Sequence, residues 1–295
     1  MHAMNRNRSL ITLTICVAMA LAAGCADDHA PRVLLVASNN GQLGDTGRDT
    51  GVWMAEITHP YLALADSGLD LTLDLASPDG GDAPIDEFSV AFNFDDFLAS
   101  GVPDSGDPSN QRFLESLATR DLVATKTIQV MNEDGTMSEA TRHRFVNTLR
   151  LADIDIADYD AIYFAGGNGA MWQFPDSEDV HRIVQEMYES DRLVGAACHG
   201  TSALLGTKLS SGEYLVAGRR VTGFSTAEEQ YLGQADVMPL LLQEGFEARG
   251  AIYVEAEPWQ PNVVVDGRLI TGQNPPSAAG VGEALADALR NRLAE

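Results

Sequence analysis

The chain has 295 residues, of which 45% are hydrophobic and 21% charged, a composition typical of one large or two small globular domains. Its formal net charge of −24 argues against nucleic-acid binding, because a surface that binds phosphates needs an excess of Lys and Arg. The acidity otherwise indicates only solubility and repulsion between copies.

The beginning of the chain has the pattern of a targeting segment. Two arginines precede an apolar run over residues 10–23 that is short for a membrane span. Small residues then precede Cys25, as in the cleavage box of bacterial lipoproteins, although the leucine lies one place earlier than usual. We therefore expect a signal peptide over residues 1–24, a lipid on Cys25 and a tether over 25–31. The protein would then be an exported lipoprotein, anchored in a membrane on the periplasmic or cell-surface side. The alternative is an ordinary signal peptide in which Cys25 is incidental.

From residue 32 onward, continuous apolar runs alternate with amphipathic segments. The runs fit buried parallel strands and the amphipathic segments fit helices. The predicted strands are 33–37, 70–76, 161–165, 193–197, one near Val221, one near Ile252, and the pair 263–265 and 269–271. The predicted helices are 50–67, 111–118, 139–149, 177–190, one from about His199, 227–232, 237–247 and 276–293. This alternation predicts a three-layer α/β sandwich, in which helices cover both faces of a mostly parallel sheet.

Two segments interrupt this alternation. The turn residues of 77–84 predict a loop. Residues 87–150 are the least regular part, and we interpret them as an elaboration within a single domain over 32–295, because no linker-like run flanks them.

The segment 195–200 carries the clearest chemical signal. Small residues end a buried strand at Cys198, and Gly200 follows at once, as in a nucleophile elbow that projects a side chain from the carboxyl edge of a sheet. A helix start beyond the turn would favour the thiolate, and His199 is a candidate general base. The other two cysteines would be removed or acylated on export, so Cys198 would have no disulfide partner. The alternative is a buried cysteine that acts only as a small apolar residue.

A glycine cluster, Gly166-Gly167-Asn168-Gly169, follows the preceding predicted strand. Backbone N–H groups of Gly167 and His199 could together form an oxyanion hole. A plain turn is the alternative for this cluster.

Seven motifs, taken in order, resemble those of the ThiJ/PfpI superfamily in its glyoxalase III and heat-shock chaperone branch. They lie at 43–61, 76–81, 158–162, 166–172, 196–200, 221–229 and 269–275. The resemblance extends from Arg32 to the end of the chain. It implies the flavodoxin-like fold of class I glutamine amidotransferase domains, with a nucleophile elbow.

The resemblance also implies catalytic roles. Cys198 matches the nucleophile and His199 the histidine of a triad. Glu229 matches the acid that orients this histidine, and the adjacent Glu228 is the other candidate for that role. The alternative for Glu229 is an exposed glutamate on a helix, without a catalytic role. Glu56 matches the acid that hydrogen-bonds the sulfur, and we expect its pKa to be raised, because two like charges resist joint ionisation.

Five further residues are expected around the pocket. They are Asn168, Trp172, His59, Gln273 and Asn274. The family often has a histidine where this chain has Asn168, so the substrate choice or the activity is expected to differ. Packing or loop positions are the alternatives for the other residues. No histidine spacing predicts a metal site, and no cofactor is expected.

The resemblance implies a cofactor-independent enzyme that converts methylglyoxal or glyoxal into a hydroxy acid through a hemithioacetal on Cys198. A Cys-His hydrolase or hydratase, such as an amidase, protease or isonitrile hydratase, would use the same elbow. A redox-responsive or chaperone-like stress protein is the non-enzymatic alternative. The expected partner is a small reactive carbonyl or another small molecule, and a homodimer is left open.

Overall fold

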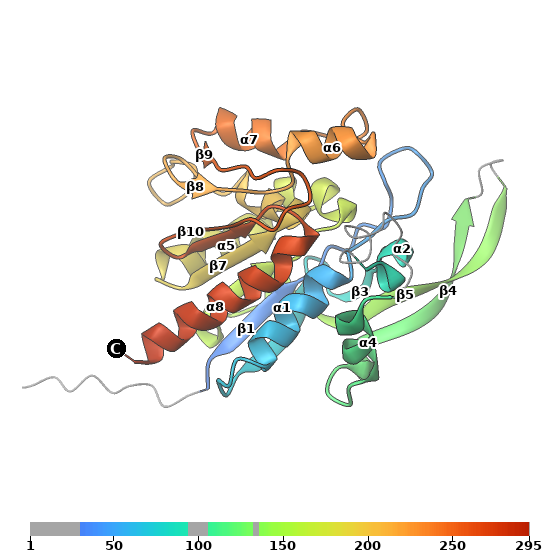
Figure 1. Ribbon diagram of the computed structural model, residues 1–295, viewed down its shortest axis with the longest axis horizontal. Coiled ribbons are helices and arrows are strands. Elements are labelled where there is room, and N and C mark those ends of the chain that lie inside the picture. Colours follow the sequence, from blue (N-terminus) through green and yellow to red (C-terminus); the bar gives the residue numbers. More distant parts are fainter. Residues whose placement is uncertain (1–29, 94–105, 132–135, 295) are drawn as a thin grey trace, which may run out of the picture.

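The computed structural model describes residues 30–93, 106–131 and 136–294, which form an α/β structure around one large mixed sheet (Figure 1). The strands are β1 (Arg32–Val36), β2 (Thr72–Ser77), β3 (Gly81–Pro84), β4 (Val123–Met131), β5 (Met137–Arg150), β6 (Ala161–Phe164), β7 (Leu193–Ala197), β8 (Arg220–Val221), β9 (Ile252–Tyr253), β10 (Val263–Asp266) and β11 (Leu269–Gly272). The α-helices are α1 (Ala55–Ala65), α2 (Glu87–Ala91), α4 (Pro108–Glu115), α5 (Glu178–Glu189), α6 (Thr226–Leu232), α7 (Leu242–Ala248) and α8 (Ala278–Leu293).

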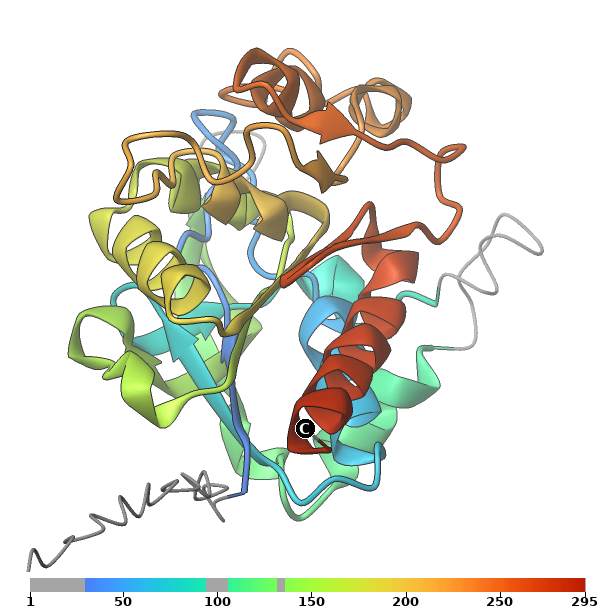
Figure 2. The same cartoon turned by 90° about the vertical axis from the view of Figure 1, so that its left-hand side faces the viewer.

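The strand order is β10-β11-β7-β6-β1-β2-β5-β3, with β4 paired to β5. Strands β11, β7, β6, β1 and β2 pair in parallel and form the centre of the sheet. Figure 2 shows α1 and α8 side by side on one face of this sheet and α5 on the other. The three-layer α/β architecture predicted from the sequence is confirmed.

The alternation of side chains along β1 explains why both faces need a helical layer. Val33 and Leu35 belong to the buried cluster that includes the side chains of α1 and α8. Leu34 and Val36 point the other way, into the cluster that includes the side chains of α5. A strand that is apolar on both faces is stable only when both faces are covered.

Two predictions, one within the elaboration and one for the loop that precedes it, are wrong. Residues 139–149, predicted as a helix, belong to strand β5, which pairs in antiparallel register with β4 from Val123 opposite Phe145 to Met131 opposite Met137. β-branched and aromatic residues in this segment favour a strand, and a long-range partner decides the outcome. The predicted loop at 77–84 contains β3, which pairs with the other edge of β5. The β4–β5 ribbon extends away from the body of the molecule (Figure 1).

The carboxyl ends of β1, β6 and β7 meet at one edge of the sheet. The helix predicted from about His199 is instead a short 3-10 segment, Cys198–Leu204, that follows β7 directly. Helices α6 and α7 and strands β8 and β9 lie beyond this edge (Figure 1). The edge therefore brings together the glycine cluster after β6, the turn after β7 and the acidic residues of α6.

Candidate active site

The backbone at Cys198 is held in an unusual conformation. Its φ is +53°, in the left-handed region that costs a residue with a Cβ about 1–2 kcal/mol. A Cβ on Gly200 would lie 2.3 Å from the carbonyl oxygen of Phe164, so only glycine fits there. The strand, the sharp turn and the glycine are the parts of a nucleophile elbow. The Cys198 side chain is 2% exposed and lines a cavity.

His199 connects Cys198 to an acid. Its Nδ1 lies 3.7 Å from the Cys198 sulfur, and its Nε2 lies 2.7 Å from Glu229 Oε1. The imidazole packs against the ring of Phe224, with 4.4 Å between the ring centroids. With its Nε2–H donated to Glu229, the neutral imidazole leaves Nδ1 free to accept a proton from the sulfur. This order of thiol, imidazole and carboxylate is that of a catalytic triad.

The two neighbouring glutamates of α6 differ sharply in their surroundings. Glu228 forms a capping box with Ser225 at the start of α6, and it also accepts hydrogen bonds from the side chains of Gln273 and Asn274 and from the backbone N–H of Trp259. Glu228 therefore ties α6 to two loops and does not face the imidazole. Glu229, one residue further on, is the acid that contacts His199.

Glu56 lies in the first turn of α1 and is fully buried. Its Oε2 accepts a hydrogen bond of 2.9 Å from the backbone N–H of Gly166. Burial raises the pKa of Glu56 to about 8, although hydrogen bonds with Cys198 and with Gly166 oppose that rise. A Cβ on Gly166 would lie 2.7 Å from Glu56 Oε2, so the glycine permits this close approach.

The thiol of Cys198 does not follow the expectation from the sequence. Burial, followed by the negative charge of Glu56, raises the pKa of Cys198 well above its ordinary value, while the backbone N–H of His199 lowers it. Because Glu56 and Cys198 repel each other when both are charged, the pair holds at least one proton near neutral pH. A protonated Glu56 removes that repulsion and can donate to the sulfur.

Two backbone nitrogens lie close to the space that Gly166 leaves open. A Cβ on Gly166 would lie 2.8 Å from the backbone nitrogens of both His199 and Gly200, so these nitrogens face the space that the glycine leaves open. Gly167, with φ of +96°, lines the same cavity, and a Cβ there would lie 2.3 Å from the carbonyl oxygen of Gly51. This arrangement is suited to bind an oxygen that becomes negatively charged.

The cavity has a volume of about 510 Å³. Of the residues expected around it, Asn168 lines the cavity and the other four do not. His59 pairs with Asp107 at 2.8 Å, and the Trp172 ring packs under Gly44. Gln273 and Asn274 bond to Glu228, and so they support the site from outside the cavity.

Most residues that line this cavity were not predicted from the sequence to belong to the site. The unassigned lining residues are Leu43, Arg48, Asp49, Trp53, Asp86, Phe88, Phe92, Phe224, Tyr231, Leu232, Gln234, Trp259 and Pro275. Trp53 and Phe224 lie inside motifs that were recognised, and Tyr231 lies two residues after Glu229 on α6. Their positions within those motifs were the available signal.

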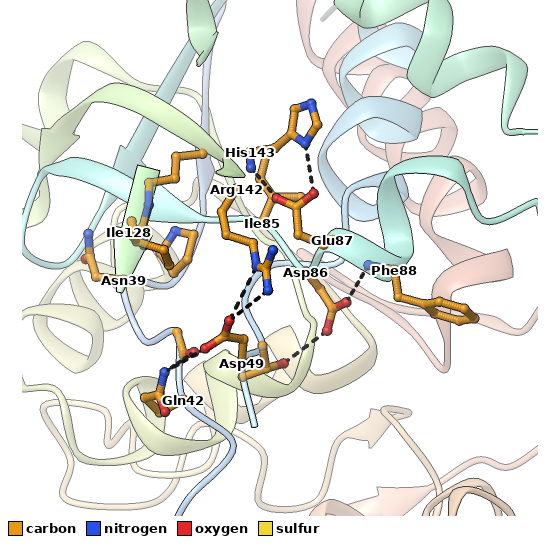
Figure 3. A pocket seen from close by; sticks show the side chains of 14 residues that line it. Asn39, Gln42, Asp49, Ile85, Asp86, Glu87, Phe88, Ile128, Arg142 and His143 are labelled. Atoms are coloured by element: carbon orange, nitrogen blue, oxygen red, sulfur yellow. Dashed lines mark hydrogen bonds and ion pairs between the residues drawn. The ribbon is translucent and has the colours of Figure 1, made fainter. Parts of the chain in front are cut away.

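A second cavity, of about 440 Å³, lies beside the first and is shown in Figure 3. Four of its lining side chains form two pairs, since Arg142 Nη2 lies 3.3 Å from Asp49 Oδ2 and His143 Nδ1 lies 3.0 Å from Glu87 Oε2. Asp49, Asp86 and Phe88 line both cavities, which therefore share a wall. None of the predicted catalytic residues lines this second cavity.

The residues of the described ranges include no group of three or more His, Cys, Asp or Glu side chains placed to hold a metal ion. The site geometry consists of the thiol, the imidazole, two carboxyl groups and backbone N–H groups. These groups can perform nucleophilic addition and proton transfer.

The chain is similar to proteins of known type. A model of the DJ-1/PfpI family matches residues 114–288. Glyoxalase 3 of Candida albicans is 28% identical over 257 residues, which cover 85% of this chain and 94% of that protein. A glutathione-independent glyoxalase of Saccharomyces cerevisiae is 28% identical over 270 residues, which cover 89% of this chain and 100% of that protein.

Two solved structures resemble the fold closely. The crystal structure of glyoxalase III from Candida albicans has a TM-score of 0.69 and 27% identity, covering 88% of this chain and 98% of that chain. The X-ray structure of the Rapid Encystment Protein 24 kDa of Francisella tularensis has a TM-score of 0.72 and 33% identity. The match covers 88% of this chain and 99% of that chain.

These comparisons correct the predicted location. The protein was expected to be an exported bacterial lipoprotein, but the curated relatives that match most of the chain are yeast glyoxalases, and their names describe no exported lipoprotein. Within residues 30–93, 106–131 and 136–294, no helix is long and apolar enough to span a bilayer. The apolar run at 10–23 and Cys25 lie outside the described residues. The prediction depended on a short local motif in which the leucine lies one place earlier than usual, and such motif matches are weak signals.

Proposed function

The chain belongs to the DJ-1/PfpI family, and on this premise we propose that it is a glutathione-independent glyoxalase whose nucleophile is Cys198. The resemblance to the glyoxalase III branch predicted from the sequence is confirmed by relatives that match most of the chain and bear that name. The substrate is a small 2-oxoaldehyde such as methylglyoxal or glyoxal.

One observation carries the proposal. The 3.7 Å approach of His199 to the Cys198 sulfur, with Glu229 behind the imidazole, occurs at the bottom of a cavity that also contains Glu56. A free thiol with an adjacent base is what a glutathione-independent reaction requires, because the enzyme's own sulfur takes the place of the glutathione thiol.

The reaction divides into steps that these residues can perform. The Cys198 sulfur adds to the aldehyde carbon while its proton leaves to His199, which gives a hemithioacetal after the oxygen is protonated. A base then removes the proton on that carbon, and an enediol forms. Return of a proton to the neighbouring carbon gives a thioester. Water cleaves the thioester, which releases the 2-hydroxy acid and restores the thiol.

We assign the supporting roles as follows. Glu229 holds His199 in the tautomer that accepts a proton at Nδ1. Protonated Glu56 donates to the sulfur and keeps the negative charge near it low. The backbone N–H groups of Gly167 and His199 bind the substrate oxygen. The neutral amide of Asn168 contacts the second carbonyl group of the substrate.

The test is the formation of lactate from methylglyoxal by the purified protein without glutathione. We expect activity from the natural chain and none from Cys198→Ala. No lactate from the natural chain at high enzyme concentration would overturn the proposal. The homodimer expected from the sequence stays a prediction, which sedimentation velocity tests.

A further inference from the structure

Aromatic side chains form one wall of the cavity above Cys198, which we call the first aromatic wall. Trp53 meets Phe92 with 5.4 Å between ring centroids and an interplanar angle of 73°. The ring centroid of Phe88 lies 6.2 Å from that of Trp53 and 5.0 Å from that of Phe92. All three rings line the cavity. They come from the segment just before α1 and from α2 and its end.

A second aromatic wall comes from a distant part of the chain. Trp259 lies 5.7 Å from Phe224 and 5.5 Å from Tyr231, in edge-to-face contact with both. These three rings also line the cavity. Phe224 in turn packs against the imidazole of His199, so this wall begins at the catalytic centre and continues outward to Tyr231.

The outer rings of the two walls are exposed. Phe88 and Tyr231 are each 65% exposed, and they are the exposed aromatic residues among the large hydrophobic side chains of the described ranges. Leu232, next to Tyr231, is 44% exposed and lines the same cavity. Exposed apolar surface gathered at a cavity indicates a site for an apolar ligand, because burying it against a ligand is favourable.

The size of the cavity also indicates a site for a ligand larger than glyoxal or methylglyoxal. Its volume of about 510 Å³ lies within the range of roughly 300–1,000 Å³ that is typical of pockets for drug-sized ligands. Glyoxal and methylglyoxal would contact the sulfur and the backbone N–H groups but would leave both aromatic walls uncovered. A substrate that reaches the walls must carry a flat apolar group next to the reacting carbonyls.

Resting on the proposed glyoxalase function, we propose that the preferred substrate is an aryl 2-oxoaldehyde. Its ring packs against the two aromatic walls while its aldehyde carbon meets Cys198. The chemistry balances without an oxidant, because the aldehyde carbon is oxidised to the acid as the ketone carbon is reduced to the alcohol. One water molecule is consumed, and an aryl 2-hydroxy acid is released. Phenylglyoxal, which would give mandelate, is the probe.

Two variants isolate the contribution of the rings. Phe88→Leu and Tyr231→Leu keep an apolar side chain of similar reach at an exposed position, so they remove the ring without opening a core cavity. Val265→Ala, at an exposed position on β10 outside the cavity lining, is the matched control. Product must be measured as mandelate by chromatography, because phenylglyoxal also modifies arginine side chains.

In the natural chain we expect kcat/KM for phenylglyoxal to exceed that for methylglyoxal by about tenfold, the effect of one to two ring contacts. Each leucine variant lowers the ratio of the two kcat/KM values about fivefold to tenfold, and Val265→Ala leaves the ratio unchanged. Equal or better use of methylglyoxal, or an unchanged ratio in both leucine variants, would overturn the inference.

A binding measurement separates this inference from the proposed function. Two of the three tryptophans line the cavity, so their fluorescence reports an aromatic ligand. Acetophenone, an aryl ketone without an aldehyde, should quench a Cys198→Ser variant in a saturable way, whereas acetone should not. Saturable quenching that weakens with Phe88→Leu, without turnover of either aldehyde by the natural chain, would support the aryl site and overturn the glyoxalase proposal. Absence of both turnover and quenching would overturn both.

Discussion

His199 Nε2 lies 2.7 Å from Glu229 Oε1, and both side chains are only about 2% exposed. The adjacent Glu228, equally buried, is held by a capping box and by two loops, and its hydrogen-bond partners are Ser225, Trp259, Gln273 and Asn274. Two chemically identical neighbours on one short helix thus have separate tasks. Glu229 contacts the histidine proposed to be catalytic, and Glu228 ties the helix that carries both glutamates to two loops.

Glu229→Gln should therefore reduce catalysis, whereas Glu228→Gln should reduce the stability of the fold. Loss of the orienting carboxylate in Glu229→Gln should lower kcat for 2-oxoaldehyde turnover about 100-fold, with a small change in melting temperature. Glu228→Gln should instead lower the free energy of unfolding by about 1–3 kcal/mol, because a buried acceptor of several hydrogen bonds is weakened. Steady-state kinetics and urea unfolding of the two variants check this, and the reverse pattern would contradict the assignment.

The raised pKa of Glu56 makes stability depend on pH. Between about pH 4.5 and 8 the folded protein keeps a proton on Glu56 that the unfolded chain has released. The stabilisation that this proton gives to the folded protein is complete below pH 4.5 and is lost as the pH rises to about 8. Over this range the free energy of unfolding falls by about 1.4 kcal/mol per pH unit. Urea unfolding of the natural chain and of Glu56→Gln measures it. The difference between the two free energies should fall across this range, and a constant difference would contradict the pKa.

The same proton affects catalysis. Above pH 8, ionised Glu56 repels the thiolate of Cys198, so kcat/KM of the natural chain should fall at alkaline pH. Glu56→Gln supplies a neutral side chain that can accept from the N–H of Gly166 and donate to the sulfur at every pH. The variant should keep measurable activity and lose the alkaline decline. A pH–rate profile with the same decline in both proteins would assign that decline to another group.

Gly166 is the residue that keeps the space beside the sulfur open. Gly166→Ala would place a Cβ 2.7 Å from Glu56 Oε2 and 2.8 Å from the backbone nitrogens of His199 and Gly200. We expect kcat/KM to fall about 100-fold or more, as on loss of an oxyanion-hole donor. Circular dichroism checks that the variant folds.

Gly245→Ala is the control for that experiment. Its added Cβ would meet the flexible end of Leu205 at 3.1 Å, on a helix remote from the cavity lining. It should keep the activity of the natural chain. If Gly166→Ala retained half of the activity of the natural chain, the result would contradict the proposal that the reacting oxygen binds in the space beside Gly166.

The sequence predicted what depends on local chemistry. The buried strand, the small residues and Gly200 around Cys198 specify the turn at positions next to each other in the chain, and the resemblance located Glu56 and Glu229. The choice between Glu228 and Glu229 depends on partners such as Trp259 and Asn274, which are far away in sequence.

Other features could not be predicted because distant segments decide them. The segment 139–149 has enough apolar periodicity for a helix, but β3 and β4 pair with its two edges. The pKa of Cys198 depends on burial and on the charge of Glu56, so its shift is opposite to the one expected from a helix start after the turn. The cavity brings together two aromatic walls that lie more than a hundred residues apart in the sequence, which no local pattern indicates.

In the proposed reaction Cys198 bonds covalently to the substrate. The most direct measurement is peptide mass spectrometry after rapid acid quenching of the natural chain mixed with excess methylglyoxal, in parallel with Cys198→Ala. We predict an adduct with the mass of one methylglyoxal on the peptide that contains Cys198, which forms before lactate and decays as the substrate is consumed. Lactate formation that continues in Cys198→Ala, or turnover without any adduct on that peptide, would contradict the account.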